Sequence, residues 1–174
     1  LRGDLGTVEG VNPYLVALLY AGDRADAAAT IRKWLSEDKV VIVDRYVYSN
    51  IGYQCAKIAD KEARATLREW ILHTEFEEFA IPKPDLSLFL DVPFAFTERK
   101  LTEVREGEDR EYLQGGKDIH EASLDLQRRV REVYLESAAL SEDLHVVNCS
   151  NEEGGMALPE EIFERIMEYV APLI

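Results

Sequence analysis

The sequence predicts an α/β fold in which a doubly wound parallel sheet is covered by helices on both faces. Three short segments, at residues 40–44, 85–91 and 144–148, have the length and apolar content of buried strands. Helical segments separate them, and this alternation is typical of right-handed βαβ crossovers. Such sheets place their ligands at the carboxyl ends of the strands, so we expect functional residues there.

Composition limits the class of protein. The 174-residue chain has a net charge of −14, which opposes binding to nucleic acids. Its apolar runs are shorter than the ~20 residues of a membrane span, and its first residues have neither the basic start nor the apolar core of a signal peptide. Two cysteines favour a reduced protein with buried thiols. We therefore expect one domain over residues 1–174, cytoplasmic, with no membrane partner.

A long helix is predicted over residues 13–36, because Asn12 supplies an N-cap and Pro13 suits the first helical position. Its apolar residues indicate burial: Leu15, Val16, Leu18, Leu19, Ile31, Trp34 and Leu35. Tyr20 and Arg24 are four residues apart and lie on one side of this helix. They could grip one flat ligand; the alternative is ordinary packing of Tyr20 and a salt bridge from Arg24.

The run Val-Val-Ile-Val-Asp at residues 40–44 predicts a buried strand that brings Asp44 and Arg45 to the sheet edge. A buried charge without a partner is costly. Each of the two therefore needs the other, a metal ion or an anionic ligand. A strand that simply ends in a solvated acid–base pair is the alternative.

The remaining elements follow from caps and periodicity. Ser49 is expected to cap a helix that carries Tyr53 and Gln54. Beyond the strand at 40–44, four helices are predicted, at 50–59, 61–80, 93–103 and 118–140. A fifth is predicted to begin near Pro159. Residues 104–117 have almost no apolar content and three glycines, which predicts a mobile surface segment. Its arginines are either solvated or brought onto a ligand when the segment closes.

Four motifs in order resemble those of the thymidylate kinases, within the P-loop nucleoside monophosphate kinases. Asp44-Arg45-Tyr46, Ser49 and Tyr53-Gln54 resemble the DRY, S and YQ signature of that family. The stretch from Leu18 to Arg24 resembles its nucleoside-gripping helix, the stretch from Pro84 to Pro93 its PDL and LDVP strand, and the stretch from Arg105 to Arg110 its lid. The resemblance extends from about residue 13 to residue 174.

The sequence departs from the family in one respect. It has no G-x-x-x-x-G-K-[ST] phosphate loop, since its one Gly-Lys pair, Gly116-Lys117, is followed by Asp118. In the family this loop lies N-terminal to all four motifs. Together with the small number of predicted strands, this leads us to expect that the N-terminal phosphate-loop portion of a longer protein is absent from this sequence.

The resemblance implies that the protein phosphorylates dTMP to dTDP with MgATP. Tyr20 or its neighbour would stack on thymine, and Arg24 would reach a carbonyl oxygen of the base. Arg45 would hold the 5′-phosphate, which Asp44 would position directly or through Mg²⁺. Ser49 and Asn50 would line the base and sugar side of the acceptor site, and Gln54 would contact the base or phosphate. Tyr53 would lie against the deoxyribose, where its ring leaves little room for a 2′-hydroxyl.

On the donor side, Arg99, Arg105 and Arg110 would contact the phosphates of ATP and the transferring group, the latter two from a mobile lid at about 104–117. Ser150 and Asn151 would lie near the adenine. The resemblance also implies a P-loop NTPase-type fold and a homodimer, for which the apolar helix at 13–20 could supply a face. The alternatives are another deoxynucleoside or nucleoside monophosphate kinase, or a non-catalytic nucleotide-binding domain.

Overall fold

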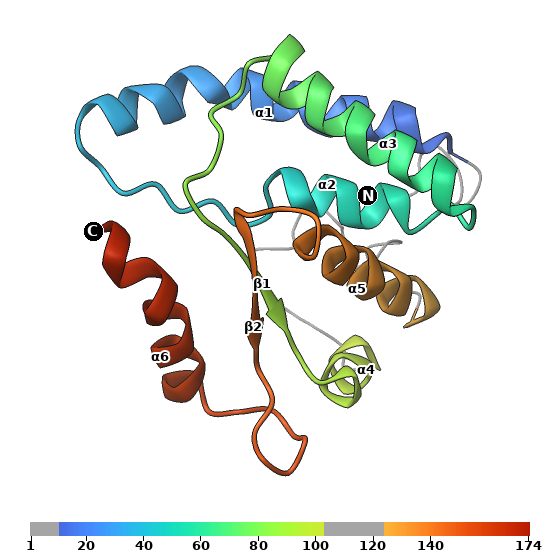
Figure 1. Ribbon diagram of the computed structural model, residues 1–174, viewed down its shortest axis with the longest axis vertical. Coiled ribbons are helices and arrows are strands. Elements are labelled where there is room, and N and C mark those ends of the chain that lie inside the picture. The colour runs from blue at the N-terminus through green and yellow to red at the C-terminus, as the bar shows by residue number, and fades with distance from the viewer. Residues whose placement is uncertain (1–10, 103–123) are drawn as a thin grey trace.

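The computed structural model describes residues 11–102 and 124–174 (Figure 1). The elements, in chain order, are α1 (Pro13–Ser36), α2 (Val47–Cys55), α3 (Lys61–His73), the π-helix η1 (Thr74–Glu78), β1 (Ser87–Asp91), α4 (Phe94–Thr102), α5 (Leu124–Ala138), β2 (Leu144–Asn148), α6 (Pro159–Val170) and the 3-10 helix η3 (Ala171–Leu173). The predicted lid at 104–117, with Arg105 and Arg110, lies outside the described residues.

The described sheet has two strands, β1 and β2, which pair in parallel from Ser87 opposite Leu144 to Asp91 opposite Asn148. These strands confirm the predictions at 85–91 and 144–148. Helices α5 and α6 both pack on β2, and Figure 1 shows them on opposite sides of the sheet. The described chain is therefore a helix-rich α/β structure with a small parallel sheet, and none of its described helices has the length and apolarity to cross a membrane.

Helix α2 lies at the centre of the main core, between α5 on one side and α1 and α3 on the other (Figure 1). Its Val47, Ile51 and Cys55 are fully buried, and they pack in one cluster with residues of α3 and α5: Leu67, Ile71, Leu126, Val130 and Val133. Gly52 permits the close approach of α2 to α5, because a Cβ atom there would lie 2.7 Å from Cε2 of Tyr134. Residues of α2 are therefore held rigidly.

The prediction of a buried strand at 40–44 is wrong. The segment runs without strand pairing from α1 to α2, and Val40 and Ile42 are 69% and 91% exposed. β-branched residues favour an extended backbone, but a strand also needs a neighbour to pair with. In the described ranges β1 pairs only with β2, so residues 40–44 have no partner strand.

The predicted bounds of α1 are confirmed, but its predicted burial is wrong. Alanines form its buried face, at Ala17, Ala21 and Ala28. The larger apolar residues Leu15, Leu18, Leu19, Trp34 and Leu35 are all at least 42% exposed. Small residues allow α1 to lie close to α2, and this geometry turns the leucines outward.

Two predicted helices differ in their bounds. Helix α2 begins at Val47, three residues earlier than predicted, so Ser49 lies inside the helix and Tyr46 occupies the N-cap position. The segment predicted as one helix over 61–80 is α-helical only to His73 and then widens into the π-helix η1. Such a widened turn redirects side chains, and Glu75 is buried as a result.

Candidate functional site

A cavity of about 300 Å³ lies between α1, the connection at 40–46 and α2. Its lining includes every residue that the sequence predicts for the acceptor site: Tyr20, Arg24, Asp44, Arg45, Ser49, Asn50, Tyr53 and Gln54. Although the connection is not a strand, it still carries Asp44 and Arg45 to the start of α2. The structure thus brings these residues to one place.

Arg24 is fixed in the wall of the cavity by a buried carboxylate. Its Nε donates to Oε2 of Glu75 at 2.5 Å and its Nη2 donates to Oε1 at 2.5 Å. Glu75 is 0% exposed. The salt bridge considered as an alternative for Arg24 is therefore present. It leaves the guanidinium at the cavity wall, because Arg24 also lines the cavity.

The side-chain amide of Asn50 has one possible orientation. Asn50 is 3% exposed, and its Nδ2 donates to the carbonyl oxygen of Ala17 at 3.0 Å and to Oε1 of Glu75 at 2.9 Å. Both partners only accept hydrogen bonds, so the amide nitrogen must face them. Oδ1 is left as a buried acceptor without a partner among the described residues, in a side chain that lines the cavity.

Arg45 lies over Tyr53. Its Nη2 donates to the Tyr53 hydroxyl at 2.6 Å, and its Cζ is 4.7 Å from the ring centroid. The backbone of Arg45 has φ 65°, a left-handed conformation that costs a side-chain-bearing residue about 1 to 2 kcal/mol. Such conformations are concentrated at functional sites, where the surrounding structure maintains them. Here α2, which begins two residues later, supplies that constraint.

Helix α5 supports the cavity from the opposite side of α2. Gln127 Nε2 lies 3.5 Å from the Tyr53 hydroxyl. Tyr134 stacks on Phe89 of β1 with ring centroids 4.3 Å apart and hydrogen-bonds Ser49. Burial raises the pKa of Tyr134 and this hydrogen bond opposes the shift. The neutral phenol therefore packs against both the sheet and the cavity wall.

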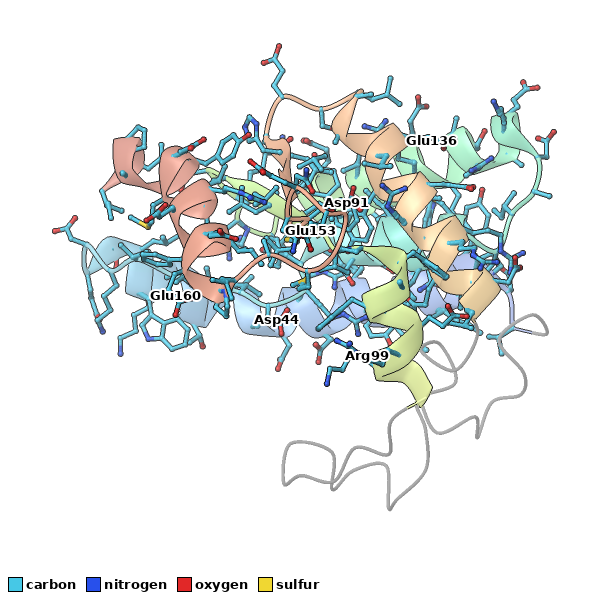
Figure 2. The ribbon with its side chains drawn as sticks, turned by 90° about the horizontal axis from the view of Figure 1, so that it is seen from below. Asp44, Asp91, Arg99, Glu136, Glu153 and Glu160 are labelled. Atoms are coloured by element: carbon cyan, nitrogen blue, oxygen red, sulfur yellow. The ribbon has the colours of Figure 1, made fainter. Side chains whose placement is uncertain are left out.

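The predicted donor-side residues are separate from this cavity. Arg99 is exposed on α4, with its guanidinium carbon 5.4 Å from the Phe96 ring centroid, and Figure 2 places it at the same edge of the molecule as Asp44. Ser150 and Asn151 lie in the loop between β2 and α6. Asn151 Oδ1 accepts from the backbone nitrogens of Glu153 and Gly155 at 3.1 and 2.8 Å. These hydrogen bonds therefore use Asn151 Oδ1 to stabilise the turn at residues 151–155.

Sequence reasoning did not find three polar side chains that organise these regions. Glu75 holds Arg24 from 51 residues away. Arg131 forms a fork with Asp91 at the end of β1, at 2.5 and 2.8 Å. Arg165 donates to the carbonyl oxygens of Asn148 and Ser150 at 2.6 and 2.9 Å. The partners in each case are distant in sequence, so no local pattern reveals them.

A wider groove of about 550 Å³ lies elsewhere, lined by Tyr48, Phe76, Lys83 and Asp143 among others. Its charges are matched within the protein, since Lys83 pairs with Glu77 at 3.2 Å and the Tyr48 hydroxyl donates to Asp143 at 2.6 Å. The smaller cavity instead presents an unpaired acceptor and two arginines. We therefore place the candidate site in the smaller cavity.

The fold is of the α/β class, and its cavity brings together two arginines, two acids and three tyrosines. A sequence model described as thymidylate kinase matches residues 1–156. The chain belongs to the thymidylate kinase family. The P-loop NTPase α/β fold of that family agrees with a helix-rich structure that contains a small parallel sheet.

Three curated relatives show the extent of the similarity. The chain is 36% identical to a probable thymidylate kinase of Pyrococcus abyssi over 155 residues, 88% of this chain and 63% of that protein. It is 34% identical to the thymidylate kinase of Mycobacterium tuberculosis over 140 residues, 80% of this chain and 62% of that protein. For a probable thymidylate kinase of Pyrobaculum aerophilum the identity is 30%, over 94% of this chain and 71% of that protein. The chain thus spans less than two thirds of the length of the first two.

Proposed function

We propose that the protein containing this chain phosphorylates dTMP to dTDP with MgATP, and that the cavity between α1 and α2 is the dTMP site. The observation that carries the proposal is the pairing of a fixed donor, Arg24, with a fixed acceptor, Asn50 Oδ1, in one cavity wall. Thymine presents carbonyl oxygens on either side of its N3–H. Arg24 therefore donates to a carbonyl oxygen of the base and Asn50 Oδ1 accepts from N3–H.

The phosphate of dTMP is assigned to Arg45. Phosphoryl transfer requires positioning and neutralisation of charge on phosphate oxygens, and a guanidinium supplies a planar fork for this purpose. The acceptor oxygen is already anionic, so the step does not require a general base. Tyr53 places its ring against the deoxyribose, with Arg45 over the same ring. Ser49 is assigned to the base and sugar side of the site, and Gln54 to the base or phosphate.

Asp44 is assigned to Mg²⁺. The described residues contain no cluster of three acidic, histidine or cysteine ligands, but Mg²⁺ commonly takes one or two carboxylates together with substrate phosphates and water. A single exposed carboxylate beside Arg45 fits that requirement. When bound, Mg²⁺ neutralises charge on the phosphates.

The residues of the ATP side are assigned from the family resemblance and from their positions in the chain. Arg99, Arg105 and Arg110 are assigned to the phosphates of ATP, the latter two from a lid at about 104–117. Ser150 and Asn151 are assigned to the adenine side, with the Ser150 carbonyl oxygen held by Arg165. The same proposal includes a single P-loop NTPase-type domain with a doubly wound sheet, in a cytoplasmic protein whose two cysteines are free thiols.

A homodimer is proposed to form through α1. Leu15, Leu18 and Leu19 are 51%, 42% and 56% exposed on its first turns. Burying these side chains on a second copy would remove apolar surface from water. Leu15→Glu combined with Leu19→Glu should then yield a monomer in sedimentation analysis, while an unchanged mass would contradict this assignment.

Phosphorylation of dTMP, dUMP, dCMP and UMP by the full protein tests the proposed activity. Preference for dTMP supports it, and preference for UMP contradicts the assignment of Tyr53 to the deoxyribose. A protein that binds dTMP without phosphorylating it is a nucleotide-binding domain. The observation that favours this second candidate function is that these 174 residues contain no phosphate-loop motif.

A further inference from the structure

Glu75 is a buried carboxylate behind the cavity wall. It lies in the π-helix η1, is 0% exposed, and is not one of the residues that line the cavity. An ionised group buried to this extent requires partners that compensate for its lost hydration. Its hydrogen-bond partners, Arg24 and Asn50, both line the cavity.

The carboxylate connects two elements of the site. Oε2 accepts from Nε of Arg24, and Oε1 accepts both from Nη2 of Arg24 and, at 2.9 Å, from Nδ2 of Asn50. Arg24 belongs to α1 and Asn50 to α2. One side chain therefore fixes a donor and an acceptor that belong to two residues lining the cavity.

A purely structural role does not require a carboxylate. Buried ion pairs are weak contributors to stability, and apolar residues of similar volume often replace them without loss. A carboxylate is distinctive because it only accepts hydrogen bonds. It therefore turns the Asn50 amide nitrogen toward itself and leaves Oδ1 as an acceptor without a partner among the described residues.

We propose that Glu75 is a positioning residue that sets the base selectivity of the acceptor site, favouring pyrimidine nucleotides that carry N3–H over cytidine nucleotides. The inference rests on the proposed function. Thymine and uracil offer a carbonyl oxygen to Arg24 and N3–H to Asn50 Oδ1. Where Arg24 contacts the 4-position of the base, cytosine offers an amino group there and an unprotonated N3, so it opposes a donor with a donor and an acceptor with an acceptor. A site that is fixed in this way rejects the mismatched base strongly.

Glu75→Gln tests the role of the carboxylate with little change in volume. The introduced side-chain amide has one oxygen and one NH₂ group, so it cannot accept all three hydrogen bonds that the carboxylate accepts from Arg24 and Asn50. Either the guanidinium is released or the Asn50 amide rotates and presents its NH₂ group to the base. We expect the affinity for dTMP to fall at least about tenfold and the ratio of dTMP to dCMP affinity to fall by a similar factor.

Titration calorimetry of the full protein with dTMP, dUMP and dCMP measures both quantities. Glu78→Gln is the matched control, because Glu78 lies in the same π-helix, its side chain is 67% exposed, and it pairs with His73. The control should keep the affinities and selectivity of the unsubstituted protein. Steady-state kinetics should show a raised KM for dTMP with kcat changed less than about threefold, since Glu75 acts on binding of the acceptor.

Glu75→Asp carries the test where Glu75→Gln does not fold, as judged by circular dichroism. Aspartate keeps the charge but is one methylene shorter, so it cannot reach both partners, and an intermediate loss of selectivity is expected. Unchanged selectivity in a folded variant overturns the inference and leaves the proposed function intact. An unsubstituted protein that does not prefer dTMP to dCMP overturns both.

Discussion

Arg45 and Tyr53 form one unit at the mouth of the candidate acceptor site. The guanidinium donates to the tyrosine hydroxyl at 2.6 Å and lies over the same ring, 4.7 Å from its centroid. Arg45 stands before α2 with a left-handed backbone, and Tyr53 lies within that helix. In the proposed site, this arrangement would present the Arg45 cation to the phosphate and the Tyr53 ring to the sugar.

Arg45→Ala should strongly weaken dTMP binding and leave the fold intact, because the side chain is exposed and is assigned to the phosphate. Loss of charged hydrogen bonds predicts a penalty of about 2 to 3 kcal/mol in dTMP affinity. Calorimetry measures this loss, and thermal unfolding should show little change. Lys39→Ala, at another exposed cation just before the connection at 40–46, is the control; equal affinities for both variants would refute the assignment of Arg45.

Substituting Arg105 and Arg110 together should lower turnover much more than dTMP affinity, because lid contacts are expected to form in the transition state. Steady-state kinetics with dTMP and ATP separate the two effects. A proportional loss in turnover and in acceptor affinity would instead make these arginines ground-state ligands.

Gly52→Ala should destabilise the fold, because the new methyl group would lie 2.7 Å from the Tyr134 ring, which is itself stacked on Phe89. Overpacking of this kind costs about 1 to 3 kcal/mol. The matched substitution Gly22→Ala meets no atom within 4 Å in the interior of α1, and it should stabilise by about 0.5 to 1 kcal/mol. Urea unfolding of both variants checks the opposite signs; a stabilising Gly52→Ala would show that α2 and α5 have room to separate.

Alkaline pH should destabilise the protein partly through Tyr48. Burial, together with the hydrogen bond to Asp143, raises the pKa of Tyr48 from 10.0 to about 12. The protonated phenol is favoured in the folded state, so its contribution is complete below pH 10 and is lost as the pH rises from 10 through 12. The shift corresponds to about 2 to 3 kcal/mol.

Tyr48→Phe provides the comparison for that pH effect. The free energy of unfolding of the variant should be lower at about pH 8, since Asp143 loses a donor, and it should fall less steeply above about pH 10. Identical pH slopes for the two proteins would show that Tyr48 does not contribute.

Burial also raises the pKa of the Cys55 thiol to about 12, so this residue should resist alkylation in the folded protein at about pH 8.

Local sequence signals were sufficient for most elements. The Asn12-Pro13 cap, the apolar runs at 85–91 and 144–148, and Pro159 each mark an element whose bounds depend on neighbouring residues. The prediction of a strand at 40–44 was wrong because strand formation depends on residues outside the run. Its β-branched residues favour extension, whereas pairing depends on a partner that the run itself does not specify.

In the candidate site, too, local sequence patterns predicted some features, whereas features that depend on distant residues were not predicted. Tyr20 and Arg24 share a helix face, and the run from Asp44 to Gln54 is nearly continuous, so motif spacing alone places them together. Glu75 escaped sequence analysis because its burial depends on a π-turn and on an arginine of another helix. The orientation of the Asn50 amide follows from that contact and cannot be derived without it.

A crystal structure of the full protein with dTMP tests the central claim most directly. We expect the thymine in the cavity between α1 and α2, with N3 about 2.9 Å from Asn50 Oδ1 and a base carbonyl oxygen at hydrogen-bond distance from Arg24. The 5′-phosphate should lie against Arg45. Thymine bound in the groove lined by Tyr48 and Lys83, or bound with its N3 edge turned away from Asn50, would contradict the account.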